Sequence, residues 1–461
     1  MKSKFIIQLI AALGGAWLCY NAQGWGINVF IICLAVAFFT LTQKITDWQQ
    51  ASLLSLAGLL IALYGNSFSI WMFMVAILLV GSTARYDLKL PLALLNGTQQ
   101  LVTNGWRFTF SNPEKTRTQS IFNLRNTSLL ILPLIITTIF YLLYCSASDT
   151  FAEKLDFSFL NELNWSFVIL SCLFLYLSYG LFYSLNGAQL YFWQQTQPDI
   201  LVRIRRNFSG ITNPFFLKWE YQTAVIALVC LNLLLLAFHF IDLDMVLANR
   251  PEKGVHLQKL LHQGVYALIL SIVLAISLLL YVFRGNLNFF SKNKTLKQLT
   301  YLWILQNAWL ALTTAQKNMW YVTQFGLTWK RIGVWIYLTL VLVGLVLTWL
   351  KIRDKKTLWW LVKRNVQIAI TVLFIMATAP WTRIITWYNI NEAQVTDFDY
   401  LLNLSIDNTD QLSRVENRMS SQQADRLYFR EKELQESTEQ GQWKNWTLTN
   451  QYSYAQLQEN K

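Results

Sequence analysis

Eleven apolar spans constrain what this chain can fold into more than any other feature of its sequence. A helix that crosses the hydrocarbon core of a bilayer takes roughly 20 residues, with a range of about 17–25. Because that core offers no water to backbone N–H and C=O groups, consecutive spans of this kind fold as helices. The spans are residues 5–20, 25–41, 48–64, 68–83, 129–146, 167–185, 223–241, 264–283, 299–316, 332–352 and 366–380.

The first four spans are at or below the lower end of that length range. Aromatic residues such as Tyr20, Trp25, Trp48 and Tyr64 close them, and aromatic rings gather at the two interfaces of a membrane. This favours four crossing helices over a re-entrant pair. The sequence therefore predicts an all-α, polytopic integral membrane protein with about 11 transmembrane helices and a short helical C-terminal tail, with the lipid bilayer as its first partner.

The composition points the same way. Only 14% of the residues are charged, whereas a soluble domain has about 25%. The net charge of +13 is the excess of Lys and Arg expected in cytoplasmic loops, so nucleic acid is not an expected partner. The five cysteines form neither a CxxC nor a Cys/His ligand spacing, which predicts no disulfide framework and no metal site.

The placement of basic residues predicts the orientation. Residues 84–127 and 351–364 each contain six Lys or Arg, whereas residues 147–166 contain one. Since basic loops stay in the cytoplasm, eleven spans give a cytoplasmic N-terminus and an extracytoplasmic C-terminus. The chain divides into a four-span region (1–83), a cytoplasmic loop (84–127), a seven-span membrane domain (128–390) and an extracytoplasmic polar tail that is partly helical (391–461).

The tail differs from the rest of the chain in charge. Residues 391–461 hold twelve acidic and seven basic side chains, a net charge of −5. Residues 397–419 and 420–436 have the mixture of apolar and charged residues typical of helices. A segment this short and polar buries little core of its own, so we expect a loosely held helical appendage. Its apolar face would hold Tyr400, Leu401, Leu404, Leu412 and Val415.

Polar residues in the span at 299–316 form the first candidate site. Gln306 and Asn307 lie in its middle, and Thr313 and Thr314 follow. An unpaired amide in hydrocarbon is costly, so these side chains face other helices or a hydrated space. Two interpretations stay open. The residues hydrogen-bond neighbouring helices as a packing cluster, or they line a path for a substrate or an ion.

The turn at residues 325–331, FGLTWKR, forms the second candidate site, with His256 of the outer loop as a further surface contact. Gly326 permits a positive φ angle, and Thr328 suits the N-cap of the next span. Arg331 lies near a helix N-terminus, the less favourable end for a cation. Either it is a solvated arginine, or it meets a partner carboxylate or a lipid phosphate.

Several stretches resemble a bacterial family of multi-pass membrane proteins catalogued only as domain of unknown function four-one-seven-three. They are the FGLT-x-x-R motif at Phe325–Arg331, WYNI at 387–390 and DFDYLLNLSID at 397–407, together with VHLQKLLHQGVYALILSIVLA from Val255 onward and FRGNLNFF from Phe283 onward. The likeness covers roughly residues 218–407. It implies a location in the bacterial cytoplasmic (inner) membrane and a polytopic helical fold, and it implies no activity.

The sequence carries no catalytic signature. HExxH, GxSxG, P-loop and paired-carboxylate patterns do not occur in it, so we predict no catalytic residues, no cofactor and no enzyme. Asp, Glu, Lys and Arg avoid the centres of the spans, which disfavours ion-coupled transport. The first hypothesis is a non-enzymatic envelope component that acts through helix packing and through binding another envelope protein. The alternative is a carrier or channel for a small or amphipathic solute along the spans between 264 and 352.

Overall fold

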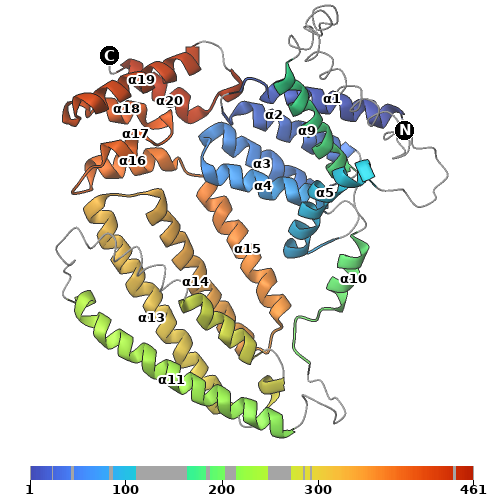
Figure 1. The fold of residues 1–461 in the computed structure, drawn as a ribbon, viewed down its shortest axis with the longest axis vertical. Coiled ribbons are helices and arrows are strands. Elements are labelled where there is room, and N and C mark those ends of the chain that lie inside the picture. The colour runs from blue at the N-terminus through green and yellow to red at the C-terminus, as the bar shows by residue number, and fades with distance from the viewer. Residues whose placement is uncertain are drawn as a thin grey trace, which may run out of the picture.

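A computed structural model describes residues 2–22, 24–42, 46–82, 87–110, 164–182, 187–202, 214–247, 271–283, 286–290, 293–439 and 443–459. Within these ranges the chain consists of helices and short connections, without a β-strand (Figure 1). The all-α prediction is therefore confirmed for the described residues. The predicted span at 129–146 and the candidate contact His256 lie outside them.

The N-terminal helices form one packed group, in which α2, α3 and α4 bury apolar side chains between them. Helix α1 packs on α9, α2 packs on α3, and α4 lies between α3 and α5. Val29, Cys33, Leu54, Ile61 and Met72 are among the buried residues of this group. The helices are α1 (Lys2–Cys19), α2 (Ile27–Thr42), α3 (Trp48–Tyr64), α4 (Ser67–Ser82), α5 (Leu90–Phe110), α9 (Trp165–Phe182) and α10 (Ala188–Thr196).

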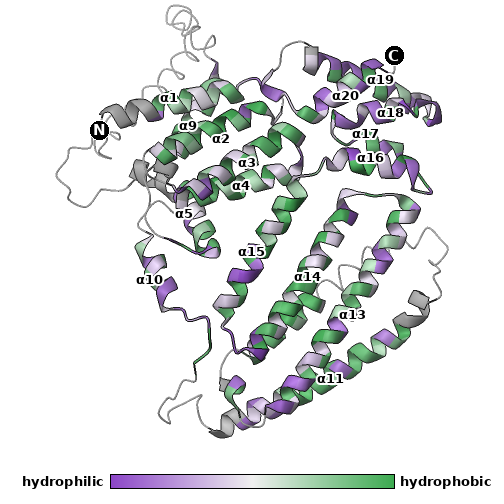
Figure 2. Ribbon diagram, turned by 180° about the vertical axis from the view of Figure 1, so that it is seen from behind, coloured by the Kyte–Doolittle hydropathy of each residue, from purple (hydrophilic) through white to green (hydrophobic). Residues whose placement is uncertain are grey.

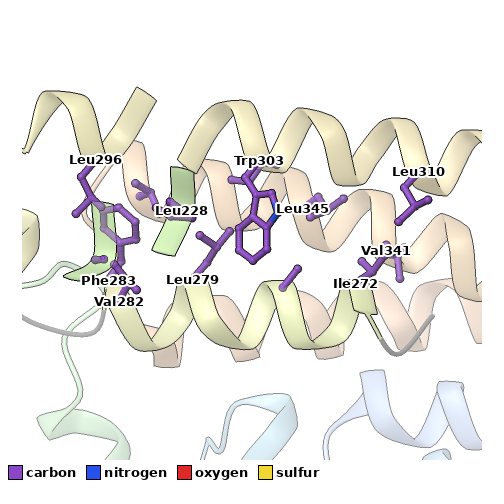
Figure 3. Close-up of a cluster of buried hydrophobic side chains, with 14 of the residues drawn as sticks. Leu228, Ile272, Leu279, Val282, Phe283, Leu296, Trp303, Leu310, Val341 and Leu345 are labelled. Atoms are coloured by element: carbon purple, nitrogen blue, oxygen red, sulfur yellow. The ribbon is translucent and has the colours of Figure 1, made fainter. Parts of the chain in front are cut away.

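A second group of helices surrounds a separate core. Leu228 of α11, Ile272 and Leu279 of the helix Ser271–Val282, Trp303 of α13 and Leu345 of α14 point toward one another (Figure 3). Helix α13 contacts both α11 and α14 along its length. The elements are α11 (Pro214–Leu247), η1 (Asn286–Phe289), α13 (Lys294–Phe325) and α14 (Trp329–Arg353), and α15 (Leu358–Ala377) links this group to α4.

Three of the described helices are long and apolar enough to cross a membrane: Lys218–Ile241 within α11, Trp329–Arg353 and Leu358–Ala377. They correspond to three of the predicted spans. Large apolar side chains on α11 remain exposed, including Leu234 (69%) and Ile241 (76%), as expected for a surface that faces lipid. Figure 2 shows hydrophobic colouring over much of α11, α14 and α15, with hydrophilic residues in between and toward their lower ends. These helices indicate a membrane protein. Further apolar helices are shorter: Gln8–Cys19, Ile27–Thr42, Trp48–Tyr64, Ser67–Val80, Trp165–Ser178 and Ser271–Val282.

Two segments expected as loops are helical. Residues 90–110, within the cytoplasmic loop predicted at 84–127, form the continuous helix α5 although they include Pro91 and Gly97. Pro91 is in the first turn, where a missing N–H costs nothing, and a Cβ at Gly97 would collide with the carbonyl of Leu78 in α4, so the glycine permits close packing. Helix α13 likewise continues beyond the predicted end of its span at residue 316 to Phe325, so that three residues connect it to α14.

The polar tail packs into a defined layer and is not loosely held. The C-terminal layer comprises α17 (Phe398–Leu402), η2 (Ile406–Asn408), α18 (Thr409–Ser413), η3 (Glu416–Arg418), α19 (Ser421–Glu439), η4 (Trp443–Asn445) and α20 (Leu448–Glu459), stacked on α16 (Trp381–Asn391) (Figure 1). Leu401, Leu412 and Leu427 are almost fully buried in it. Arg383 of α16 donates to both carboxylate oxygens of Asp410, at 2.7 and 2.9 Å. A bidentate pair of this kind fixes the layer on α16.

The end of the C-terminal layer reaches the first helices of the chain. The backbone N–H of Ile27 donates to the carbonyl of Trp446 at 3.1 Å, and Lys444 Nζ donates to the carbonyls of Trp17 and Tyr20 at 2.6 and 3.1 Å. The C-terminal layer therefore covers the α1–α2 connection as well as α16.

Candidate functional site

The turn between α13 and α14 is held in a conformation that only glycine adopts easily. Gly326 has φ 79° and ψ 176°, a region that is essentially restricted to glycine. Asn389 of α16 accepts from the N–H of Leu327 and donates to the carbonyl of the same residue, the latter at 2.9 Å. A Cβ on Gly326 would collide with the Asn389 amide, so the turn and α16 fit together only with glycine at this position.

Thr328 and Arg331 complete the turn. Thr328 is the N-cap of α14, as predicted, and its hydroxyl accepts from the N–H of Arg331 at 3.4 Å. The Arg331 side chain points back to the end of α13, where Nη1 donates to the carbonyl of Phe325 at 2.9 Å and to that of Gly326. Its position near an N-terminus looked unfavourable in the sequence. The structure resolves this, because the guanidinium caps the negative C-terminal end of the preceding helix.

A cleft of about 580 Å³ opens beside this turn. We call it the turn cleft. The phenol oxygen of Tyr400 accepts from the N–H of Trp329 at 2.9 Å, and Asp397 caps α17 by accepting from the N–H of Tyr400 at 3.0 Å. The cleft is lined by Phe325, Thr328, Trp329, Lys330 and Arg331 on one side and by Asn389, Val395, Asp397 and Tyr400 on the other. It therefore lies on the seam between the membrane helices and the C-terminal layer.

The lining of the turn cleft includes two cations, Lys330 and Arg331, and the neutral phenol of Tyr400. Burial raises the pKa of the Tyr400 hydroxyl, while the Trp329 N–H and the Arg331 charge partly oppose this. Tyr400 thus keeps its proton at neutral pH and can donate it in a hydrogen bond. The Arg331 guanidinium lies 6.0 Å from the ring centroids of both Tyr321 and Phe325. Cations flanked by aromatic rings are suited to binding an anion that also has an apolar part.

The four polar residues of the predicted span at 299–316 are buried in α13, away from the turn cleft: Gln306, Asn307, Thr313 and Thr314. Three of them bond within their own helix. Asn307 Nδ2 donates to the carbonyl of Trp303 at 2.7 Å, and the hydroxyls of Thr313 and Thr314 donate to that of Leu310 at 3.1 and 2.7 Å. Such back-bonding satisfies a polar side chain without a neighbouring helix.

Gln306 differs from the other three. Its side-chain oxygen Oε1 is buried and has no hydrogen-bond partner in the described part of the chain. The imidazole Nε2 of His239 in α11 lies 3.1 Å from the backbone oxygen of Gln306. Asn232 lies two turns before His239 on α11, and its Nδ2 donates to the carbonyls of Leu228 and Leu299 at 2.7 and 3.2 Å. Its Oδ1 also lacks a hydrogen-bond partner among the described residues. The α11–α13 interface therefore holds two buried acceptor oxygens.

Sequence reasoning missed several of these residues. His239 and Asn232 carry a simple signal, because each is a polar residue within the apolar span at 223–241. Asn389, Asp397 and Tyr400 belong to two of the stretches that carried the family resemblance, WYNI and DFDYLLNLSID. The structure brings both stretches together with the FGLT-x-x-R motif in the turn cleft. Of the predicted outer-surface contacts, Thr328 and Arg331 line this cleft, and Gly326 lies in the same turn.

The residues described by the structure contain no group of three or more His, Cys, Asp or Glu side chains close enough to hold a metal ion. His256, the remaining predicted surface contact, is outside the described residues. Of the predicted outer contacts, Gly326, Thr328 and Arg331 come together at one turn.

Comparison with known proteins gives a family and no activity. A family model described as Domain of unknown function (DUF4153) matches residues 9–415. The match reaches far beyond the expected residues 218–407 and carries a different family number, while the expectation of a family of unknown function is confirmed. No curated protein and no solved structure matches the chain. Because the match covers most of the chain, including every residue of the turn cleft, the protein belongs to the DUF4153 family.

Proposed function

We propose that this protein is a non-enzymatic component of the bacterial inner membrane that binds another envelope protein through its C-terminal layer. Its N-terminus is cytoplasmic and its C-terminus extracytoplasmic. Support comes from the apolar helices and from the basic residues of 84–127 and 351–364, which mark the cytoplasmic ends of the spans. The packing of α11, α13 and α14 around one core supplies the rigid membrane part.

One observation on α19 carries this proposal. Tyr428 and Phe429 are exposed by 66% and 67%, although α19 is otherwise rich in charged and amide side chains. Their rings are in edge contact, with centroids 5.9 Å apart. Large exposed aromatic side chains are the usual anchors of protein interfaces. The tail has a net charge of −5, so an anionic membrane surface would repel it, and a protein partner fits better.

Photocrosslinking in living cells tests this proposal. A photoreactive phenylalanine analogue replaces Phe429 in the full-length chain, and a matched control carries it at Gln422, an exposed position of the same helix. We expect a discrete protein adduct from position 429 that Tyr428→Ala weakens and position 422 does not give. Adducts with lipid alone, or the same adducts from both positions, would contradict the proposal.

A reporter fused to the C-terminus tests the orientation separately. An enzyme that is active only outside the cytoplasm should be active on this fusion, and its fusion to the connection at residues 354–357, between α14 and α15, should be inactive. The reverse pattern would place the C-terminal layer in the cytoplasm.

The two orphaned oxygens of the α11–α13 interface favour a second candidate, a carrier or channel for a small or amphipathic solute. Gln306 Oε1 and Asn232 Oδ1 are buried acceptors without partners among the described residues, and such acceptors commonly bind water or a ligand. In a cysteine-free background, Gln306→Cys should react with a water-soluble thiol reagent, whereas Leu310→Cys, one turn further along α13, should be protected. Full protection of position 306 under every condition would refute this candidate.

A further inference from the structure

We propose that the turn cleft binds the phosphate group of a membrane lipid, with Arg331 and Lys330 as its cationic contacts. This inference is independent of the protein partner proposed above, because it concerns the seam below the C-terminal layer and not the exposed face of α19. It starts from the charge of Arg331.

Arg331 is a half-buried cation without a carboxylate partner in the described structure. Two other arginines of the same region have one. Arg383 pairs with Asp410 at 2.7 Å, and Arg426 pairs with Asp399 at 2.9 Å. The carbonyls of Phe325 and Gly326 occupy only Nη1 of Arg331, so the donors on Nε and Nη2 remain for a ligand. A partly buried guanidinium in this state favours an anion that accepts two hydrogen bonds, and phosphate suits it in geometry.

Lys330 adds a second positive charge to the same side of the turn cleft. It is exposed and lines the cleft next to Arg331. Tyr400, whose raised pKa keeps it neutral, lines the opposite side. The carboxylate of Asp397 is also present, and its Oδ1 accepts from the N–H of Tyr400. The two positive charges of Arg331 and Lys330 outnumber the one negative charge of Asp397, and Tyr400 adds a hydrogen-bond donor. The cleft therefore favours an anionic group.

The position of the cleft selects a lipid over a soluble anion. Helix α14, which is apolar enough to cross a membrane, begins at Trp329 inside the cleft. The cleft therefore lies where a spanning helix leaves the hydrocarbon core, and phosphate groups of lipids lie at that depth. Phe325 and Trp387 are exposed nearby on α13 and α16, and aromatic side chains are typical of this boundary. A lipid can place its phosphate on Arg331 and its chains along these rings.

Native mass spectrometry of the full-length protein released from detergent micelles tests the proposal. The probe is phosphatidylglycerol, and a galactosyl diacylglycerol serves as the phosphate-free lipid. Wild type should retain one phosphatidylglycerol and not the phosphate-free lipid. Arg331→Gln and Lys330→Gln should each weaken retention about tenfold, the loss expected for one hydrogen bond to a charged group. Arg353→Gln, at the other end of α14 and paired with the exposed Asp354, is the matched control and should retain the lipid like wild type.

Three results would overturn the proposal. The first is wild-type retention by either Arg331→Gln or Lys330→Gln. The second is equal retention of the phosphate-free lipid, which would assign the binding to the acyl chains. The third is binding of soluble glycerol phosphate as tight as that of the lipid, which would assign the cleft to a free anion. Arg331 also caps α13, so its substitution could loosen the fold. Lys330 is exposed and has no such structural contact in the described residues, and Lys330→Gln therefore decides the question if Arg331→Gln unfolds.

Discussion

The stability of the C-terminal layer should depend on the protonation of one buried aspartate. Asp407 of η2 is almost fully buried, and its Oδ1 has no hydrogen-bond partner in the described residues. Burial raises its pKa from 3.8 to about 6, although Arg383 of α16, the Ser405 hydroxyl and Arg430 of α19 oppose the shift. The acidic groups around it are Asp410 of α18, which is paired with Arg383, and Glu433 of α19, which interacts with Arg430.

The sign and size of the effect follow from this shift. A raised pKa means that Asp407 binds its proton more tightly in the folded layer than after local unfolding has exposed it to water. The layer therefore becomes more stable as the pH falls through about 6, and this gain levels off near the ordinary value of 3.8. Between pH 7.5 and pH 4.5 the linkage relation gives a gain of about 2 kcal/mol in the free energy of opening.

Hydrogen exchange of the backbone amides in α17 to α20 measures this free energy. We expect protection in wild type to rise by about 2 kcal/mol between pH 7.5 and pH 4.5, relative to Asp407→Asn at the same two values. The comparison with the variant removes the intrinsic effect of pH on exchange. Asp399→Asn, at an exposed aspartate of the same layer, is the matched control and should show the same change of protection with pH as wild type. An equal change of protection between the two pH values in wild type and Asp407→Asn would refute the reasoning.

Two further predictions concern the contacts that hold the turn cleft and the C-terminal layer, measured by thermal or chemical unfolding of the purified full-length protein. Gly326→Ala should destabilise the fold by about 3 kcal/mol, because it combines backbone strain with loss of the Asn389 hydrogen bonds. In the control Gly333→Ala the new methyl group meets open space on α14, so this change should be neutral or stabilising by up to about 1 kcal/mol. Asp410→Ala should cost about 3–5 kcal/mol, because it leaves Arg383 buried without its partner. A small and equal effect of both glycine substitutions, or a cost below 1 kcal/mol for Asp410→Ala, would contradict these assignments.

Helices with a uniform apolar character could be predicted from the sequence. The spans at 48–64 and 332–352 agree with α3 and α14 to within a few residues, since hydropathy alone marks their ends. Helix α13 was underestimated, because Lys317 and Asn318 end the apolar run while the helix continues. Asn318 is buried there and donates to the carbonyl of Arg331 at 3.2 Å. A polar residue that pairs across two helices has no signature in hydropathy.

The candidate site was predictable in part. The glycine at 326 and the N-cap at 328 follow from local backbone preferences, and the structure has both. The role of Arg331 was not predictable, because its partners lie on the preceding helix and not on its own. Asn389 and Tyr400 were also out of reach of local rules, since they contact the turn across 62 and 71 residues of sequence. Packing of the tail depends on similar long-range contacts.

The contact between the end of the C-terminal layer and the start of α2 has a consequence for biogenesis. The backbone N–H of Gly24 donates to Asn445 Oδ1 across 421 residues of sequence. The backbone N–H of Ile27 donates to the carbonyl of Trp446. During translation α1 and α2 are made long before Asn445 and Trp446. The α1–α2 connection therefore gains these two hydrogen bonds only after the C-terminal layer has been made, and a chain that stops before Asn445 leaves the N–H groups of Gly24 and Ile27 without these acceptors.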